Sequence, residues 1–251
     1  MPADYAVLAP IYDTLGMADF AQSITPRLID YAQRLDWLGR RILDLGCGTG
    51  ASLEWLIRRN YVTIGVDESP QMLDLCRQKL DAENLSYDVR VGDVRQLSAD
   101  VGTMDMVLAL DVINELNSLR DLETLFTSVN KVLAAEKLFI FDMHTIEGLC
   151  QQGLTSDQIV YNQVDLTVIT SSSYDFERQI HERRYLLFQR QGDNWSRSEG
   201  VRVLRGYPAQ AVAALLQRCG FQVMKAVTTD FSDFEPGISR ADRIFVLAQK
   251  Q

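Results

Sequence analysis

Three glycines at alternate positions, Gly46, Gly48 and Gly50, are the clearest indication of chemistry in the chain. The apolar run before them (residues 42–45) predicts a short buried parallel strand, and residues 51–59 predict a helix. Glycine lets a chain turn sharply and brings no Cβ atom against a ligand. A loop between a strand end and a helix N-terminus is where open α/β sheets bind nucleotides. The spacing is not the G-x-G-x-x-G of dinucleotide enzymes, and no P-loop lysine follows.

Aspartate follows four of the predicted strands, as Asp67, Asp93, Asp111 and Asp142. The carboxyl ends of parallel strands meet at one edge, so we expect all four side chains to face the crevice outside the glycine loop. Asp67 stands at the interval where such folds place an acid on ribose hydroxyls, and Asp93 is suited to accept from an exocyclic amine. The alternative is that these aspartates cap turns and helices. A crevice with this much negative charge favours a nucleoside that carries a positive centre over NAD. NAD binding remains an alternative.

The elements that would position these residues alternate between strands and helices. Strands are expected at residues 42–45, 62–66, 87–91, 106–110 and 138–141, and helices at 20–35, 51–59, 69–80 and 119–133. A helix at 209–219 and strands at 221–228 and 243–248 close the chain. The alternation predicts an α/β fold of the Rossmann-like, doubly wound type, with a mostly parallel seven-stranded sheet.

The alternation is interrupted after His144. Residues 160–205 are rich in aromatic and β-branched residues and predict an antiparallel insert of three or four strands, near 164–174, 179–190 and 195–205. We therefore expect residues 1–144 and 206–251 to form the ligand-binding domain and residues 145–205 an insert on the substrate side. The aromatic residues of the insert either line an acceptor pocket or form the core of this small sheet.

Three blocks in order, residues 42–50, 65–73 and 92–94, resemble the class I S-adenosylmethionine-dependent methyltransferases. The likeness covers roughly residues 40–144. The segments 5–13 and 111–116 resemble a narrower group, small bacterial methyltransferases with an antiparallel insert after the fifth strand, akin to sugar-amine N-methyltransferases. The resemblance implies S-adenosylmethionine as cofactor and a small-molecule acceptor.

The resemblance also implies roles for individual residues. The loop glycines would lie against the methionine end of the cofactor, Asp67 would hold the ribose hydroxyls, and Asp93 would accept from the adenine amine. Met72 would pack on the adenine, and Tyr12 would belong to an N-terminal lid. The full set of implied cofactor residues is Tyr12, Asp44, Gly46, Cys47, Gly48, Gly50, Asp67, Glu68, Met72, Asp93, Val94, Leu110 and Asp111.

The sequence departs from the family pattern at two places. Ala134-Ala135-Glu136 replaces the common Pro-Gly-Gly turn before the fifth strand. Glu115 stands where a histidine or aromatic residue is common, which leaves the identity of the methyl acceptor open.

Methyl transfer from a sulfonium releases a neutral leaving group, so the protein mainly has to align the nucleophile and exclude water. A hydroxyl acceptor usually needs a base, whereas an amine needs only to arrive unprotonated. The candidate catalytic residues are His144, Asp111 and Glu115, with Asp142 as a further candidate base. The alternative for His144 is a loop histidine without a catalytic role. We expect His181 and the pair Arg183-Arg184 to be structural or solvated.

Composition limits the partners. Residues 1–144 hold 22 acidic and 13 basic residues, which accounts for the whole net charge of −9. Such a surface repels phosphate backbones, so no nucleic-acid partner is favoured. The four cysteines are scattered and the chain has only two histidines, so neither disulfides nor a histidine-rich zinc site is expected, and we expect no metal.

Residues 1–20 lack the order of a signal peptide, and we expect a cytoplasmic monomer or homodimer without membrane contact. The function expected is methyl transfer to an amine or hydroxyl of a small molecule. The alternatives are a methyltransferase acting on tRNA or protein, and a non-catalytic S-adenosylmethionine-binding module.

Overall fold

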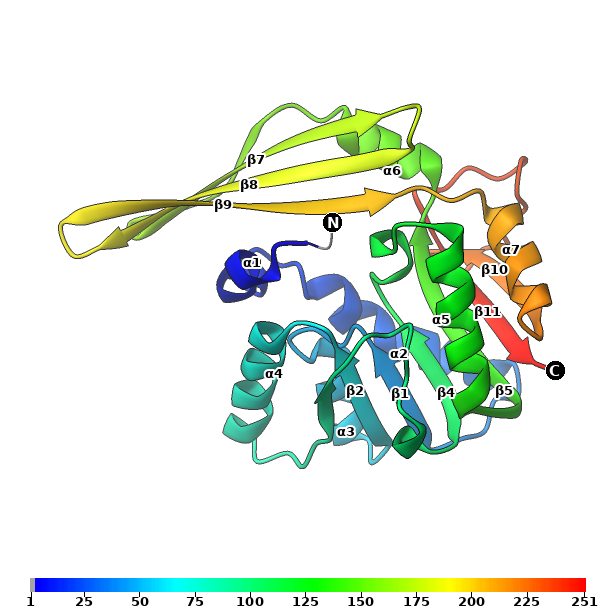
Figure 1. The fold of residues 1–251 in the computed structure, drawn as a ribbon. Coiled ribbons are helices and arrows are strands. Elements are labelled where there is room, and N and C mark those ends of the chain that lie inside the picture. The colour runs from blue at the N-terminus through cyan, green and yellow to red at the C-terminus, as the bar shows by residue number, and fades with distance from the viewer. Residues whose placement is uncertain (1–2) are drawn as a thin grey trace.

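The computed structural model describes residues 3–251, which form two sheets (Figure 1). The larger sheet has seven strands in the order β10-β11-β5-β4-β1-β2-β3. Its members are β1 (Arg41–Leu45), β2 (Val62–Asp67), β3 (Val89–Val91), β4 (Met104–Ala109), β5 (Leu133–His144), β10 (Phe221–Thr228) and β11 (Arg243–Lys250). Only β11 runs against its neighbours. The predicted fold class is confirmed.

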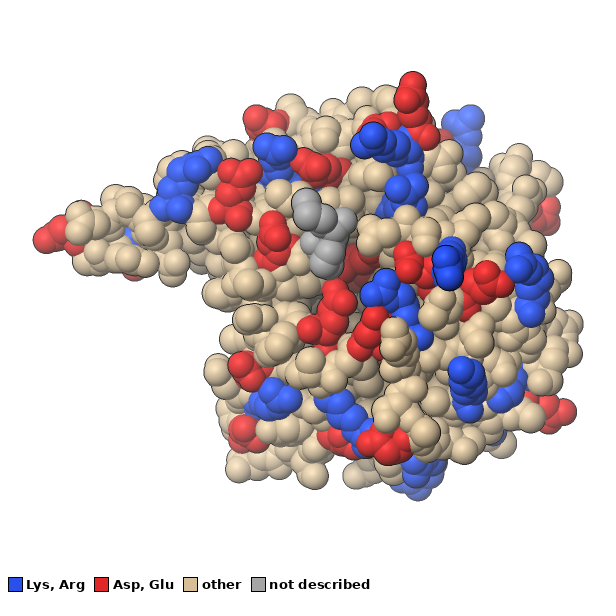
Figure 2. Space-filling model, in the orientation of Figure 1, with Lys and Arg blue, Asp and Glu red and all other residues tan. Residues whose placement is uncertain are grey.

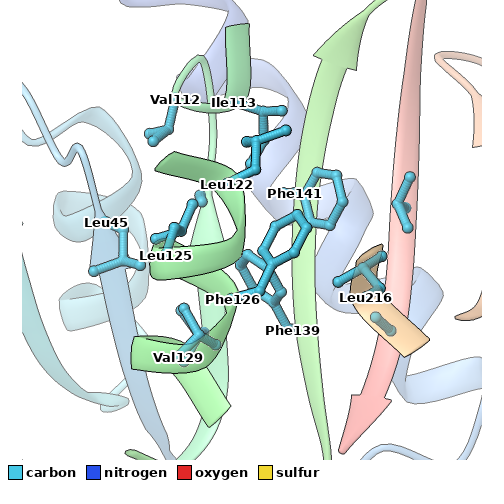
Figure 3. Packing of buried hydrophobic residues seen from close by; sticks show 14 of the residues in the cluster. Leu45, Val112, Ile113, Leu122, Leu125, Phe126, Val129, Phe139, Phe141 and Leu216 are labelled. Carbon is cyan, nitrogen blue, oxygen red and sulfur yellow. The ribbon is translucent and has the colours of Figure 1, made fainter. Parts of the chain in front are cut away.

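Helices cover both faces of this sheet because its central strands are apolar on both sides. In β4, Met106 and Leu108 pack toward α2 (Asp19–Arg34) and α3 (Ala51–Arg58), whereas Val107 packs on the opposite face. There α5 (Leu119–Val132) and α7 (Ala209–Arg218) close the core. Figure 3 shows Phe126 of α5 against Phe139 of β5, with ring centroids 5.9 Å apart. Such strands, buried on both faces, are typical of doubly wound sheets.

Local signals in the sequence explain where α4 (Pro70–Ala82) begins. The Ser69 hydroxyl accepts a hydrogen bond from the Met72 amide at 3.3 Å, and Pro70 occupies the first helical position. A serine cap followed by proline is the arrangement expected at a helix start. The cap places the Met72 side chain beneath the glycine loop, where its methyl group is 3.2 Å from the position that a Cβ on Gly48 would take.

The insert is a separate antiparallel sheet of four strands, in the order β6-β7-β8-β9. These are β6 (Gln158–Gln163), β7 (Leu166–Asp175), β8 (Ile180–Gln191) and β9 (Asn194–Arg205). Figure 1 shows them as a long arm above the edge of the main sheet. The helix α6 (Ile146–Gly153), which the sequence analysis did not anticipate, connects β5 to the arm.

The N-terminal helix α1 (Tyr5–Tyr12) lies between the insert and the main domain. Leu8 and Ile11 pack against Val168, Tyr185 and Leu187 of the insert. The amide of Asp4, just before the helix, donates to the Val201 carbonyl of β9 at 2.9 Å. This helix therefore connects the insert sheet to the side of the molecule that carries the glycine loop.

The prediction for the fifth strand was wrong in its length and in the position of Asp142. β5 starts at Leu133, and its pairing with β4 shifts between Met104 and Met106, so the segment taken for a turn is an irregular part of the strand. Glu136 adopts a left-handed φ of 62° there. Asp142 consequently lies inside β5, not after it. None of the helices in residues 3–251 is long and apolar enough to cross a membrane.

Asp44 supports a prediction about stability. It lies on β1 with 2% exposure, and no hydrogen-bond partner for its Oδ2 atom is found among residues 3–251. Burial, reinforced by Asp67, raises the pKa of this carboxyl to about 8. At pH 6 the folded protein holds this proton while the unfolded chain does not, and at pH 9 both have lost it. Raising the pH from 6 to 9 should therefore lower the unfolding free energy of the cofactor-free wild type by about 3 kcal/mol more than that of Asp44→Asn. Urea unfolding at both pH values measures this difference.

The control is Asp74→Asn, which changes an exposed aspartate of α4 that pairs with Arg77. We expect this variant to keep the pH dependence of the wild type. If Asp44→Asn also kept it, the folded protein would not carry a protonated Asp44.

Candidate functional site

A cavity opens at the carboxyl ends of β1, β2, β3 and β4, and we call it the cofactor cavity. Its wall contains most of the residues that the sequence analysis assigned to a cofactor, together with Glu115. These are Tyr12, Gly46, Gly48, Asp67, Glu68, Met72, Asp93, Val94, Leu110, Asp111 and Glu115. The residues that sequence reasoning did not assign to it are Tyr5, Arg95, Val112, Leu116 and Asn117.

The glycine loop needs its glycines for backbone conformation. Gly46, Gly48 and Gly50 all have positive φ, at 65°, 54° and 84°. A Cβ on Gly46 would lie 2.5 Å from a Val112 methyl group, and one on Gly50 would lie 2.5 Å from the Cys76 sulfur. Side chains are strained in this region and would clash at both positions. The sequence therefore keeps an open loop surface toward the cavity.

Four of the loop's amides already donate hydrogen bonds within the protein. The amides of Gly46 and Cys47 donate to the Val66 carbonyl, that of Gly50 donates to the Cys47 carbonyl, and that of Gly48 donates to Asp67 Oδ2 at 2.8 Å. Phosphate-binding loops instead point a row of free N–H groups at their ligand. This arrangement argues against a pyrophosphate and agrees with the acidic wall, so NAD binding is disfavoured on two independent grounds.

Asp67 connects the loop to the start of α4. Its second oxygen, Oδ1, accepts from the Ser69 amide at 2.9 Å. Burial raises the pKa of the carboxyl, although the two amides oppose the shift. Each oxygen keeps a lone pair, so the carboxylate is held in place and can still accept from hydroxyl groups in the cavity.

Asp44, near the end of β1, and the loop residues Cys47 and Gly50 are outside the cavity wall. Cys47 is 7% exposed, and burial raises the pKa of its thiol. The unpaired oxygen of Asp44 is a buried acceptor in the same layer. All three residues are buried, so they belong to the packed interior behind the cavity wall.

Asp93 is held by a neighbour that the sequence analysis missed. The Arg95 guanidinium donates to both Asp93 oxygens, at 2.8–3.0 Å, and also to Asp121 of α5 at 3.1 Å. These hydrogen bonds hold the pKa of Asp93 below its usual range. Asp93 is therefore a fixed, ionised carboxylate at the cavity wall, as a bidentate pair with arginine requires.

The N-terminal segment closes the cavity from the side. Tyr12, at the end of α1, lies in its wall, and the next residue, Asp13, accepts from the Thr49 hydroxyl at 2.6 Å. Lys79 of α4 donates to the other Asp13 oxygen at 2.9 Å. The Tyr5 hydroxyl donates to Glu115 at 2.5 Å. The end of α1 is therefore attached to the glycine loop and to α4, and the lid role of Tyr12 stays a prediction.

Asp111 lies at the end of β4 in a strained backbone conformation, with φ of 62°. Its amide donates to Asp142 Oδ1 at 2.7 Å, and Arg243 donates to both carboxylates at 2.6 Å. Burial raises the pKa of Asp111, but Arg243 and Arg202 outweigh that effect and keep the pKa below its usual value. The expectation that Asp142 faces the crevice was wrong: it is 1% exposed and enclosed behind Asp111.

A second cavity of about 270 Å³ lies between the main domain and the insert, and we call it the insert cavity. Of the residues that the structure describes, only Asp111 lies in the walls of both cavities. The insert contributes His181, Arg183, Tyr185, Arg202 and Leu204, and the main domain contributes Leu15, Gly16, Met17, Phe20, Asp111, His144, Gln152 and Arg243. A ligand here would lie beside a ligand in the cofactor cavity.

The candidate bases do not all line the same cavity: Glu115 lines the cofactor cavity, and His144 lines the insert cavity. His144 lines the insert cavity, where burial, reinforced by Arg243, lowers its pKa to about 3. Its Nδ1 lies 3.2 Å from the Gln152 amide nitrogen, and its Nε2 lies 3.9 Å from Asp111. Burial raises the pKa of Glu115, but Arg202 donates to this carboxylate at 2.8 Å. Burial raises the pKa of Asp142 to about 6, yet Asp142 reaches neither cavity.

Three functional arginines, Arg95, Arg202 and Arg243, escaped the sequence analysis. Arg95 follows Asp93 by two residues, and this short spacing could have predicted the ion pair between them. Arg202 and Arg243 approach the site from β9 and β11, far along the chain, and no local pattern marks them. Asn114 lies in the segment 111–116, for which the sequence indicated only the family resemblance. Its side chain bonds to the His144 main chain and to the Arg205 carbonyl, which joins the end of β5 to the end of β9.

Comparison with known proteins identifies the family of the chain. The family described as "Methyltransferase domain" matches residues 42–136. The Bacillus subtilis protein YqeM, whose name assigns it to the methyltransferases, is 30% identical over 216 residues, which cover 84% of each chain.

Solved structures agree on the fold. An S-adenosylmethionine-dependent methyltransferase from Clostridium acetobutylicum is similar with a TM-score of 0.83 at 22% identity, over 98% of both chains. CalS10 from Micromonospora echinaspora, an amino pentose methyltransferase in its S-adenosylmethionine-bound form, has a TM-score of 0.69 at 19% identity, over 96% of this chain and 97% of the other. The chain therefore belongs to the class I S-adenosylmethionine-dependent methyltransferases, with S-adenosylmethionine as its cofactor.

Proposed function

We propose that this enzyme transfers the methyl group to an amine of a small molecule held in the insert cavity. The observation that carries the proposal is the shared wall: Asp111 borders both the cofactor cavity and the insert cavity. An acceptor in the second cavity would meet the cofactor at this residue. In-line displacement needs the nucleophile held close to the methyl group, and two adjoining cavities provide that proximity.

The protonation states favour an amine over a hydroxyl. A base that activates a hydroxyl works best with a pKa near the working pH. His144, with its pKa near 3, and Asp111, with its pKa lowered, are both weak bases. Asp111 is instead suited to attract an ammonium group, which must lose its proton before transfer. Two structural neighbours agree with this choice, since CalS10 is named an amino pentose methyltransferase and KedS8 a sugar N-methyltransferase.

A macromolecular acceptor is a weaker candidate. The insert cavity, of about 270 Å³, has a volume close to that of small-molecule sites, and the insert and the main domain both contribute to its wall. The face drawn in Figure 2 shows acidic and basic side chains interspersed around the hollow below the insert, without a broad basic patch. Nucleic-acid enzymes use such patches to neutralise phosphates. The acidic balance of the chain points the same way.

The cofactor roles that the family resemblance implies are supported by the presence of these residues in the wall of the cofactor cavity. S-adenosylmethionine supplies an activated methyl group on a cationic sulfur. We assign Asp67 to its ribose hydroxyls, Met72 to its adenine and Asp93 to the adenine amine. The wall fits a cation, because the positive charge of Arg95 is already matched by Asp93 and Asp121. The four remaining carboxylates, Asp67, Glu68, Asp111 and Glu115, outnumber the two arginines that pair with them, Arg202 and Arg243.

Asp67→Ala should weaken binding of S-adenosylmethionine and of its demethylated product at least tenfold. The variant removes an acceptor for two hydroxyls, and each charge-assisted hydrogen bond contributes about 1.5–3 kcal/mol. Isothermal titration with both ligands measures the loss, and Asp74→Ala serves as the exposed control. Equal affinity in the wild type and in Asp67→Ala would contradict the assignment. Unfolding without ligand separates this effect from loosening of the loop, since Asp67 also holds the Gly48 and Ser69 amides.

His144→Gln should lower the turnover of amine acceptors less than tenfold and leave the shape of the pH profile unchanged. His144 is already neutral throughout pH 5–9, because burial lowers its pKa to about 3. The rate should rise with pH only until the acceptor amine is unprotonated. Release of the demethylated cofactor is the readout, with a panel of primary amines and their hydroxyl analogues as acceptors. If His144→Gln instead lost about a hundredfold or more of the turnover, and the wild type also methylated the hydroxyl analogues, His144 would be identified as a general base.

A further inference from the structure

We propose that Arg183 and His181 of β8 bind an anionic group, a carboxylate or a phosphate, on the methyl acceptor. The inference rests on the proposed function, because it takes the insert cavity to be the acceptor site. It narrows the acceptor to a small amine that also carries a negative charge. The sequence analysis expected both residues to be structural or solvated, and the structure places both in the wall of this cavity.

Strand periodicity brings these residues inward. Side chains alternate between the two faces of a strand, so His181, Arg183 and Tyr185 share the inner face of β8. Arg184 points outward, with 59% of its side chain exposed, and pairs with Glu182 and Glu199. The two neighbouring arginines therefore have different surroundings, although they adjoin in the sequence.

Arg183 is the uncompensated charge of the cavity. Arg202 pairs with Glu115 and Asp111, and Arg243 pairs with Asp111 and Asp142. Among residues 3–251, no carboxylate lies within 4.0 Å of the Arg183 guanidinium, whose Nε donates to the Ser172 hydroxyl at 3.2 Å.

Arg183 also stands directly opposite Arg202 in the register of β8 and β9. Like charges placed opposite each other on one face of a sheet repel. Glu115 and Asp111 satisfy Arg202, but Arg183 keeps its full charge toward the cavity. An anion bound at Arg183 would relieve the repulsion and form charge-assisted hydrogen bonds.

His181 provides the second, independent observation. Its side chain is 2% exposed, lines the cavity, and leaves both ring nitrogens without a hydrogen-bond partner in the described chain. Buried polar groups nearly always have a partner, because leaving them unpaired costs about 1–3 kcal/mol. A neutral imidazole can donate one hydrogen bond to an anion. His181 and Arg183 are thus neighbouring hydrogen-bond donors on the inner face of β8, separated by one residue in the sequence.

The two ends of the acceptor follow from this arrangement. Asp111, at the wall shared with the cofactor cavity, attracts the amine. Arg183 and His181, on the insert, receive the anion. The acceptor class is therefore a zwitterionic small molecule, in which a carboxylate or phosphate is separated from the methylated amine.

Binding can be tested without turnover. The chain has two histidines, so His144→Gln assigns both imidazole signals in a proton–carbon NMR spectrum. Inorganic phosphate and acetate are titrated separately into the full chain saturated with the demethylated cofactor. We expect a saturable shift of the His181 signal with at least one anion. Phosphate alone would identify a phosphate-bearing acceptor, and acetate alone a carboxylate-bearing one.

Arg183→Gln should weaken the affinity for the anion, measured from the titration of the His181 signal, at least tenfold. Arg183→Lys should restore part of this affinity. Arg184→Gln is the matched control and should leave the affinity unchanged. The same variants are then compared on amines that carry a carboxylate or phosphate and on their uncharged ester or amide analogues. Arg183→Gln should lose at least tenfold of the preference for the charged amine, with unchanged affinity for S-adenosylmethionine.

An unmoved His181 signal with both anions, or equal shifts in wild type and Arg183→Gln, would overturn the proposal. Preference for the uncharged analogues in the wild type would do the same. The proposed function fails separately: anion binding at His181 with no methylation of any amine would refute amine methylation while leaving the anion site intact.

Discussion

The site depends on one buried ionic cluster, formed by Asp111, Asp142 and Arg243. It joins the end of β4 to β5 and β11, and the Arg243 guanidinium also lies over the Phe20 ring of α2 at 3.3 Å. Asp142 accepts the Asp111 amide and so stabilises a backbone conformation that aspartate rarely adopts. Burying these charges is costly unless they are paired and hydrogen-bonded. The pairing therefore ties the wall between the two cavities to the core of the sheet.

The two sides of that wall have opposite electrostatic character. The cofactor side has several carboxylates and one arginine that is already paired, which suits a sulfonium. The insert side has three arginines, two of which are neutralised by the carboxylates of the wall. One chain thus offers a cation site and an anion site on either side of Asp111. The net charge of −9 belongs to the whole chain, so it does not predict the local charge at either site.

Local patterns in the sequence were sufficient for the parallel sheet and for most of the cofactor cavity. The glycine spacing, the Ser69-Pro70 cap and the apolar strand of β4 act through neighbours in the chain, so their effect is visible without the fold. β5 was misjudged because its strand continues through an irregular pairing at Glu136, which no local signal marks. Arg202 and Arg243 reach the site only through β9 and β11, so their roles depend on tertiary contacts. The inward direction of Arg183 depended on strand register, which composition alone does not provide.

The alternation along β8 also bears on how such an enzyme diversifies. Every second residue, from His181 through Arg183 and Tyr185 to Leu187, faces the main domain, while Arg184 and Leu186 belong to the other face. Substitutions that change the acceptor would fall on the inward-facing residues, and substitutions that change solubility or assembly would fall on the outward-facing residues. The two kinds of substitution can therefore accumulate on one strand without disturbing each other. Among relatives with different acceptors, divergence along this strand should alternate with a period of two.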